Sequence, residues 1–169
     1  MRPFELKDLP EVLLLLAEAK ESLKNQGIPQ WQQGYPNEES LKEDFSQKVG
    51  YVLEESGRII GYSALIIGKD PSYQNIKGNW LTKGSLYATC HRLMMTRNKS
   101  KGSSDTFLQG LITLAKEKNA SSLRVDTHEK NQPMRQLLKR QGFELCGEVV
   151  LASSQEKRLA FEKKLPLAN

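Results

Sequence analysis

Apolar positions recur along this chain with two periods, that of a helix and that of a strand. Helical spacing predicts four helices, which begin near Asp8, Asn37, Ser103 and Asn131. Each of these starts carries a residue type that caps helices, and Gly27 and Gly142 follow the first and the last helix, where glycine commonly ends one. The sequence therefore predicts four helices, two of them with local signals at both ends.

Strand-like runs occupy much of the remaining sequence. We expect an opening strand around Arg2–Leu6, and a hairpin of residues 51–54 and 59–66 that turns at Ser56-Gly57. Further strands are expected at 87–95, 122–126, 145–151 and 158–163, and a loop at 70–84. Because a helix separates strands 87–95 and 122–126, these two should be parallel neighbours joined by a right-handed crossover.

A basic loop lies between the strand at 87–95 and the third helix. It contains Lys99, Ser100, Lys101 and Gly102, and it runs into the helix start at Ser103-Ser104. Unpaired N–H groups at a helix N-terminus, beside two lysines and a glycine, favour a phosphate or pyrophosphate group. A solvated surface loop is the alternative, because Lys, Ser and Gly are common between a strand and a helix.

Composition narrows the class of protein. The 169 residues predict one domain, and the net charge of +5 comes from basic residues interleaved with 20 acidic ones. No basic stripe with stacking aromatics stands out, so nucleic acid is not favoured as a partner. No metal site is expected, because Cys90 and Cys146 lack zinc-ligand spacing and predict buried free thiols. No signal peptide or membrane span is apparent, which predicts a cytoplasmic protein without a membrane partner.

The order of these elements resembles the GNAT superfamily of acetyl-CoA-dependent N-acetyltransferases. The resemblance covers nearly the whole chain and rests on Arg2-Pro3, Asp8-Leu9-Pro10, His91-Arg92-Leu93, Gly102, Asp126-Thr127-His128, Asn131-Gln132-Pro133-Met134 and Gly142-Phe143. It implies an α/β (α+β) fold over residues 1–169. The expected architecture is a mixed, mostly antiparallel sheet of six to seven strands, with a splayed parallel pair and four flanking helices.

The resemblance also implies a function and the residues that serve it. An acetyl group would pass from acetyl-CoA to a primary amine of a small molecule or peptide. Main-chain groups of Leu93, Met94 and Met95 would bind the pantetheine arm, and Lys99, Ser100, Lys101, Gly102, Ser103 and Ser104 would hold the pyrophosphate. Asn131 would contact the cofactor from the fourth helix.

The sequence departs from the family pattern at two places. Of the pyrophosphate loop only the middle glycine, Gly102, is kept, because Lys99 and Ser104 stand where the family usually has Arg or Gln and Gly or Ala. Leu138 occupies the position of a tyrosine that protonates the departing thiolate in many members. These departures favour an alternative, a noncatalytic acyl-CoA-binding or interaction module.

Acetyl transfer to an amine needs a base, and His91 is the candidate on the strand that would face the cofactor. The alternative for His91 is a histidine satisfied by its neighbours. Trp31, Tyr35 and Trp80 are candidates for an acceptor pocket, although aromatic residues in loops also anchor those loops to a core. Both a monomer and a homodimer are compatible with the sequence.

Overall fold

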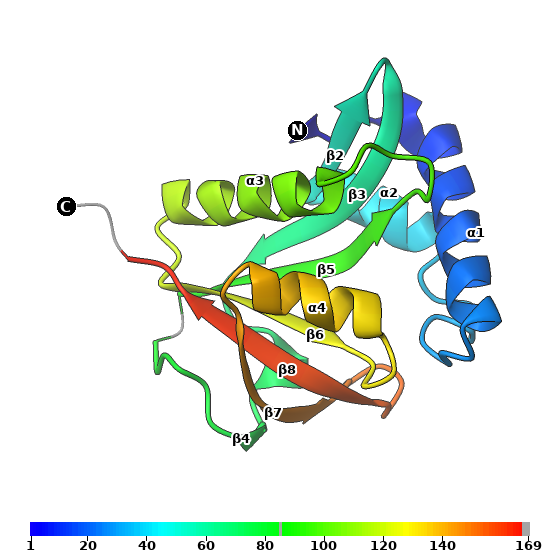
Figure 1. Cartoon of the computed structure of the whole chain (residues 1–169). Helices are drawn as coiled ribbons and strands as arrows, with labels where there is room; N and C mark the ends of the chain where they lie inside the picture. Colours follow the sequence, from blue (N-terminus) through cyan, green and yellow to red (C-terminus); the bar gives the residue numbers. More distant parts are fainter. Residues whose placement is uncertain (85, 167–169) are drawn as a thin grey trace. The chain divides into compact units, whose positions relative to one another are not determined.

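The computed structural model describes residues 1–84 and 86–166, and these residues form two compact units. Unit 1 is Met1–Leu65 with Arg92–Phe107, and unit 2 is Ile66–His91 with Leu108–Asn169. Within the described residues lie four α-helices and eight strands, and the strands form one sheet in the order β1-β2-β3-β5-β6-β8-β7-β4 (Figure 1). Strand β5 pairs with β6 in parallel, whereas the pairs β1–β2, β2–β3, β4–β7, β6–β8 and β7–β8 are antiparallel. The expected mixed α/β fold is confirmed, with one short strand more than predicted.

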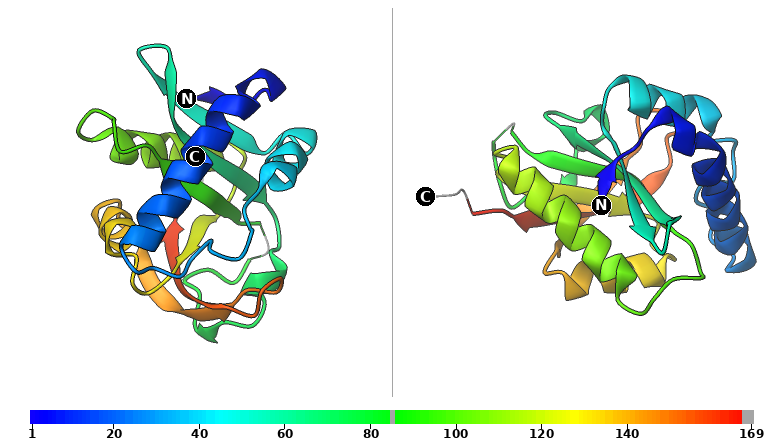
Figure 2. Two further views of the ribbon diagram at one scale, coloured as in Figure 1. Left: turned by 90° about the vertical axis from the view of Figure 1, so that its right-hand side faces the viewer. Right: turned by 90° about the horizontal axis from the view of Figure 1, so that it is seen from above.

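Unit 1 is built on the hairpin of β2 (Gly50–Glu55) and β3 (Arg58–Ile67), with β1 (Arg2–Pro3) beside β2. Ser56 and Gly57 both have positive φ, at 51° and 75°, so the predicted tight turn is confirmed. Helix α1 (Leu9–Asn25) packs beside this ribbon (Figure 2), and α2 (Glu38–Ser46) adds Leu41 to the same core. Asn37 caps α2, as predicted, because its side chain accepts a hydrogen bond from the Ser40 amide at 3.0 Å.

Asp8 departs from its predicted role as the cap of α1. Its backbone is already helical and its side chain makes no cap hydrogen bond to α1. Instead the carboxylate accepts from both Nη atoms of Arg2, at 2.7 and 2.9 Å, and from the Glu5 amide. A bidentate hydrogen bond between charged groups is stronger than a hydrogen bond to an uncharged helix amide. Asp8 therefore holds the opening strand in place, together with the single 3-10 turn η1 (Leu6–Asp8), which makes that strand shorter than predicted.

Unit 2 contains β6 (Ser122–Thr127), the hairpin of β7 (Glu144–Val150) and β8 (Lys157–Lys164), and α4 (Gln132–Arg140). The parallel pairing of β5 (Ala88–Met95) with β6 is confirmed, and its register joins Ala88 to Leu123 and Thr89 to Arg124. Helix α3 (Ser103–Glu117) forms the crossover between these strands. Most of α3 and the first half of β5 belong to unit 2, and their remaining parts belong to unit 1.

The predicted loop at 70–84 is wrong in part, because it contains two short elements. A single 3-10 turn, η2 (Pro71–Tyr73), follows Asp70, and strand β4 (Lys77–Gly78) pairs with β7. Tertiary contacts stabilise both, since Tyr73 is buried with Tyr87, Val149 and Ala160 in the core of unit 2. Elements this short carry no periodic pattern that a sequence could reveal.

Candidate active site

Strand β5 carries the residues that the sequence placed at the centre of the chemistry. Ala88, Thr89 and Cys90 are buried, and Cys90 is a free thiol, as expected, whereas the free thiol of Cys146 is only half-buried. Arg92 has φ of 56°, a left-handed conformation that costs a side-chain-bearing residue free energy. A residue keeps this backbone conformation only where surrounding contacts stabilise it. Both Arg92 and its neighbour His91 make such contacts.

In unit 2, His91 is hydrogen-bonded to a carboxylate. Its Nε2 lies 2.6 Å from Oδ2 of Asp70, and both side chains are only partly exposed. Because an ionised carboxylate can only accept, Nε2 carries the shared proton, and the basic position of the neutral ring is then Nδ1. Asp70 thereby sets the tautomer of His91, a role that the sequence analysis missed because Asp70 lies 21 residues away in a predicted loop.

In unit 1, Arg92 belongs to a buried charged cluster. Its Nε and Nη2 donate to the two carboxylate oxygens of Asp44 on α2, at 2.8 and 2.5 Å. Asp44 also accepts from the Tyr62 hydroxyl at 2.6 Å, and burial together with the Asp44 charge raises the pKa of Tyr62 far above its usual value. These hydrogen bonds stabilise the left-handed conformation of Arg92. The sequence analysis missed Asp44, because most residues of its helix are polar and nothing marks this one as buried.

One predicted acceptor residue joins this cluster. The hydroxyl of Tyr35 accepts a hydrogen bond from Nη1 of Arg92 at 2.6 Å, while the Tyr35 side chain remains exposed. Trp31, from the same connection between α1 and α2, is half-buried against the core of unit 1. The structure therefore joins Tyr35 to β5 and gives Trp31 a packing contact.

The predicted pyrophosphate loop lies in unit 1 and presents at least one amide to an anion. Ser100 N–H donates to the carboxylate of Glu55 on β2 at 3.1 Å, and hydrogen bonds from Ser100 and Ser103 lower the pKa of Glu55. Gly102 has φ of 86°, a conformation that glycine adopts without strain. Lys99 donates to the Thr96 carbonyl at 3.0 Å, so it closes the loop on itself.

The remaining predicted cofactor residues divide between the two units. Leu93 and Met94 of unit 1 are buried, and Met95 is half-buried, at the end of β5. Asn131 of unit 2 caps α4, because its Oδ1 accepts from the Met134 amide at 3.3 Å. That bond uses the amide oxygen of Asn131, while the NH₂ group is the donor that a ligand could use.

Trp80, the third predicted acceptor residue, lies in unit 2, where the rings of Trp80 and His91 both lie beside the ring of Tyr73. Its ring centroid is 5.2 Å from that of Tyr73, whose ring is 6.1 Å from the His91 ring. Its indole N–H donates to the Tyr73 carbonyl at 3.0 Å, and the guanidinium of Arg124 lies 4.1 Å from its ring centroid. These contacts anchor Trp80 to the core of unit 2.

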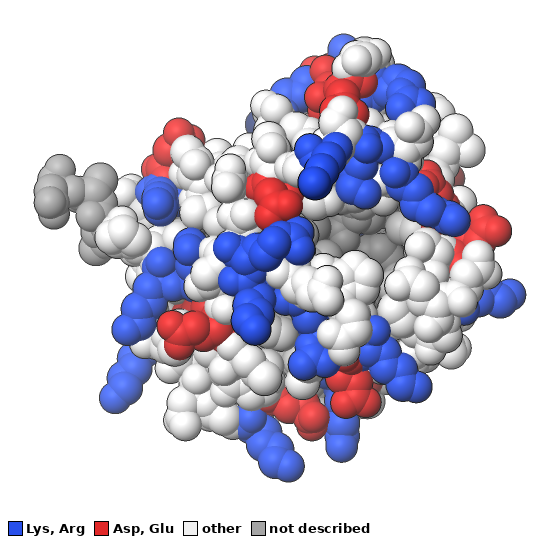
Figure 3. Space-filling model, in the orientation of Figure 1, with Lys and Arg blue, Asp and Glu red and all other residues white. Residues whose placement is uncertain are grey.

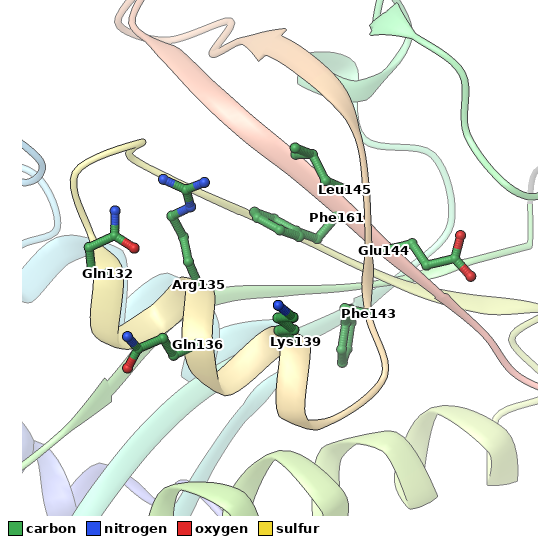
Figure 4. Close-up of a pocket in the computed structure, with 8 residues that line it drawn as sticks. All are labelled: Gln132, Arg135, Gln136, Lys139, Phe143, Glu144, Leu145 and Phe161. Atoms are coloured by element: carbon green, nitrogen blue, oxygen red, sulfur yellow. The ribbon is translucent and has the colours of Figure 1, made fainter.

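A surface pocket of about 520 Å³ lies in unit 2, between α4 and the strands β7 and β8 (Figure 4). The buried side chains of Phe143 and Phe161 line it, and Arg135 and Lys139 extend from α4. None of the residues that the sequence placed in the site lines this pocket. It is a separate feature from the contacts of His91 and Asp70.

Surface charge, metal binding and membrane insertion add three observations. Figure 3 shows Lys and Arg side chains interspersed with acidic and neutral ones, as their interleaving in the sequence implies. Among the described residues no group of His, Cys, Asp and Glu could hold a metal ion. None of the described helices combines the length and the hydrophobicity that a membrane span requires.

The chain is similar to several proteins of known structure. It is 33% identical to an acetyltransferase of the GNAT family from Streptococcus agalactiae, with a TM-score of 0.89 over 98% of this chain and 94% of that one. A Staphylococcus aureus structure is 26% identical, with a TM-score of 0.74 over 98% of both chains. A ribosomal-protein-alanine N-acetyltransferase from Brucella melitensis shares the fold, at 20% identity and a TM-score of 0.69 over 97% of this chain and 98% of that one.

No protein-family model and no curated protein matches the sequence. The similarity to the Streptococcus agalactiae structure nevertheless extends over almost the entire length of both chains, and the mixed sheet with its one parallel pair agrees with it. The chain belongs to the GNAT family of acetyltransferases.

Proposed function

We propose that this protein is an acetyl-CoA-dependent N-acetyltransferase that acetylates a primary amine of a small molecule or peptide, with His91 as the general base. The observation that carries this proposal is the 2.6 Å hydrogen bond between His91 and Asp70, on the strand that continues into Leu93–Met95. A carboxylate that holds a histidine in one tautomer and orientation prepares it to act as a general base.

The reaction requires a neutral amine, and His91 would supply it. His91 would take a proton from the acceptor ammonium, and the imidazolium that forms would be stabilised by the Asp70 carboxylate at Nε2. Acetyl-CoA, when bound, would supply a thioester whose carbonyl carbon bonds to the amine nitrogen while the carbon–sulfur bond breaks, and the nitrogen would lose its second proton to solvent as the amide forms. The thiolate leaves and is protonated by solvent, because Leu138 at the family's tyrosine position is fully buried and has no proton to give.

The loop before α3 fits an anionic group. The amide of Ser100 already binds the Glu55 carboxylate, which has the charge and oxygen geometry of a phosphate edge. We propose that Lys99–Ser104 hold the pyrophosphate, that main-chain groups of Leu93–Met95 bind the pantetheine arm, and that Asn131 contacts the cofactor through its NH₂ group.

The acceptor is the least constrained part of the proposal. Tyr35, held by Arg92, is the aromatic candidate with the firmest link to β5. Trp31 and Trp80 stay candidates, although each packs against a core. A peptide acceptor is supported by two proteins with this fold, from Brucella melitensis and Escherichia coli, which are ribosomal-protein-alanine N-acetyltransferases.

The proposal is tested by replacing the base. His91→Ala should lower kcat for acetyl transfer by at least about a hundredfold, because a general base contributes that much, and should leave the KM for acetyl-CoA nearly unchanged. Release of free thiol with a panel of amines measures turnover. His128→Ala, at the chain's only other histidine, is the matched control and should retain turnover. Equal rates for the parent and His91→Ala would remove His91 from the mechanism.

The second candidate is a noncatalytic acyl-CoA-binding or interaction module. The observation that favours it is the occupation of the Ser100 amide by Glu55, which competes with any phosphate. Absence of thiol release with every amine, together with measurable acetyl-CoA binding, would select this candidate over the enzyme.

A further inference from the structure

We infer that Tyr73 and Asp126 are positioning residues for His91, which act on it through Asp70. This inference rests on the proposed role of His91 as the base. It assigns a purpose to a short turn, and to a buried hydroxyl bonded to a half-buried carboxylate, that the reaction itself does not use.

The pair is a short hydrogen bond between two elements of unit 2. The hydroxyl of Tyr73, on η2, donates to Oδ2 of Asp126, on β6, at 2.6 Å. Tyr73 is 1% exposed, and burial raises the pKa of its hydroxyl well above the usual value, so the group stays protonated and remains the donor. The bond therefore ties η2 to β6 over the whole working range of pH.

The turn that this bond holds also orients Asp70. The Tyr73 amide donates to the Asp70 carbonyl at 3.0 Å, and the Ser72 amide donates to Oδ1 of Asp70 at 2.8 Å. With Oδ1 fixed by the turn, Oδ2 is directed at His91. A displacement of Tyr73 would therefore move the carboxylate that sets the His91 tautomer.

The other anchors of η2 make the role of Tyr73 specific. The Tyr87 hydroxyl accepts from the Asp70 amide at 2.7 Å, and the Ser72 hydroxyl accepts from the Ala152 amide at 3.0 Å. The first bond holds Asp70, the residue before the turn, and the second holds Ser72, its middle residue, whereas the Tyr73 ring inserts into the core of unit 2 and its centroid lies 6.1 Å from that of the His91 ring. Tyr73 thus fixes both the turn and the surface against which the imidazole lies.

One substitution at Tyr73 and two at Asp126 test the inference. Tyr73→Phe and Asp126→Ala remove the bond, whereas Asp126→Asn keeps an oxygen that can accept it. We expect Tyr73→Phe and Asp126→Ala to lower kcat about tenfold without changing the KM for acetyl-CoA. Asp126→Asn should keep most of the parent kcat. In an Asp70→Asn background, Tyr73→Phe should cause no further loss, because both act through one group.

A spectroscopic measurement separates this inference from the proposed function. The proton between His91 and Asp70 should give a downfield NMR resonance that is absent in His91→Ala, and Tyr73→Phe should shift or broaden it. Tyr62→Phe is the matched control, because it removes another buried hydroxyl bonded to a carboxylate at 2.6 Å, in unit 1, and should leave the resonance unchanged. Asp126→Ala and Asp126→Asn give the same comparison if Tyr73→Phe fails to fold.

The outcomes are distinct. An unchanged resonance in Tyr73→Phe and Asp126→Ala, or losses of kcat that add to that of Asp70→Asn, would overturn the positioning role. A resonance that responds as expected in a protein without acetyl transfer would support the positioning role and overturn the proposed function.

Discussion

At the scale of single residues, the most buried charge in the described chain belongs to Glu162. Its side chain is fully buried and accepts hydrogen bonds from Ser122, from Thr82 and, at 3.0 Å, from Nε of Arg124. The Arg124 guanidinium lies between the rings of Trp80 and Tyr87, at 4.1 and 3.7 Å from their centroids. Burial alone would raise the pKa of Glu162, but the hydrogen bonds and the Arg124 charge hold it below its usual range.

Removal of this carboxylate should therefore weaken the fold in a pH-dependent way. Glu162→Gln should lower the free energy of unfolding at pH 7 by about 3 kcal/mol, because it leaves Arg124 buried without its counter-charge. Because the folded pKa of Glu162 is depressed, its stabilisation is present above the unfolded pKa and is lost as the pH falls through the folded value. Urea denaturation at pH 7 and in acid should show the two proteins converging at low pH.

The matched control is Glu38→Gln, which breaks the exposed pair of Glu38 and Lys42 on α2 and should change stability little at either pH. A Glu162→Gln protein as stable as the parent at pH 7 would show that the hydrogen bonds around Glu162, and not its charge, are what matter.

At the scale of elements, the loop before α3 contacts strand β2 through the hydrogen bond from the Ser100 amide to the Glu55 carboxylate. Glu55→Gln removes the negative charge that the Ser100 amide binds, so it should tighten acetyl-CoA binding severalfold if the loop holds the pyrophosphate. Glu54→Gln is the matched control, because it makes the same change in net charge at the neighbouring position, where the side chain pairs with Arg2. Calorimetric titration measures both, and equal tightening in the two variants would attribute the effect to net charge alone.

At the scale of the whole molecule, the proposed function predicts that acetyl-CoA stabilises the folded chain. At about a hundred times its dissociation constant the ligand should add about 2.7 kcal/mol, which corresponds to a rise in Tm of roughly 5–10 °C for a protein of this size. Thermal denaturation with acetyl-CoA, CoA and ATP tests this, and ATP controls for binding through phosphates alone. No change in Tm at millimolar acetyl-CoA would contradict the cofactor assignment.

The sequence by itself determined the elements whose information is local. Asn37 and Asn131 cap the helices at which the sequence predicted them, and Ser56-Gly57 makes the expected turn, because capping and turn formation depend on neighbouring residues. The ends of α1 and α4 at Gly27 and Gly142 follow for the same reason. The order of these elements was sufficient to indicate the family.

Only the tertiary structure decided which distant side chains meet. Asp70 and His91 are 21 residues apart, and Asp44 and Arg92 are 48 apart, so no local pattern could pair them. Tertiary pairing also decided η2 and β4, which are too short for a period to be read. Asp8 differs, because its partners Arg2 and Glu5 are only six and three residues away, and the charged bond to Arg2 replaces the predicted cap of α1. Long-range hydrogen bonds between charged groups override local preference because they form only after the chain has brought those groups out of water.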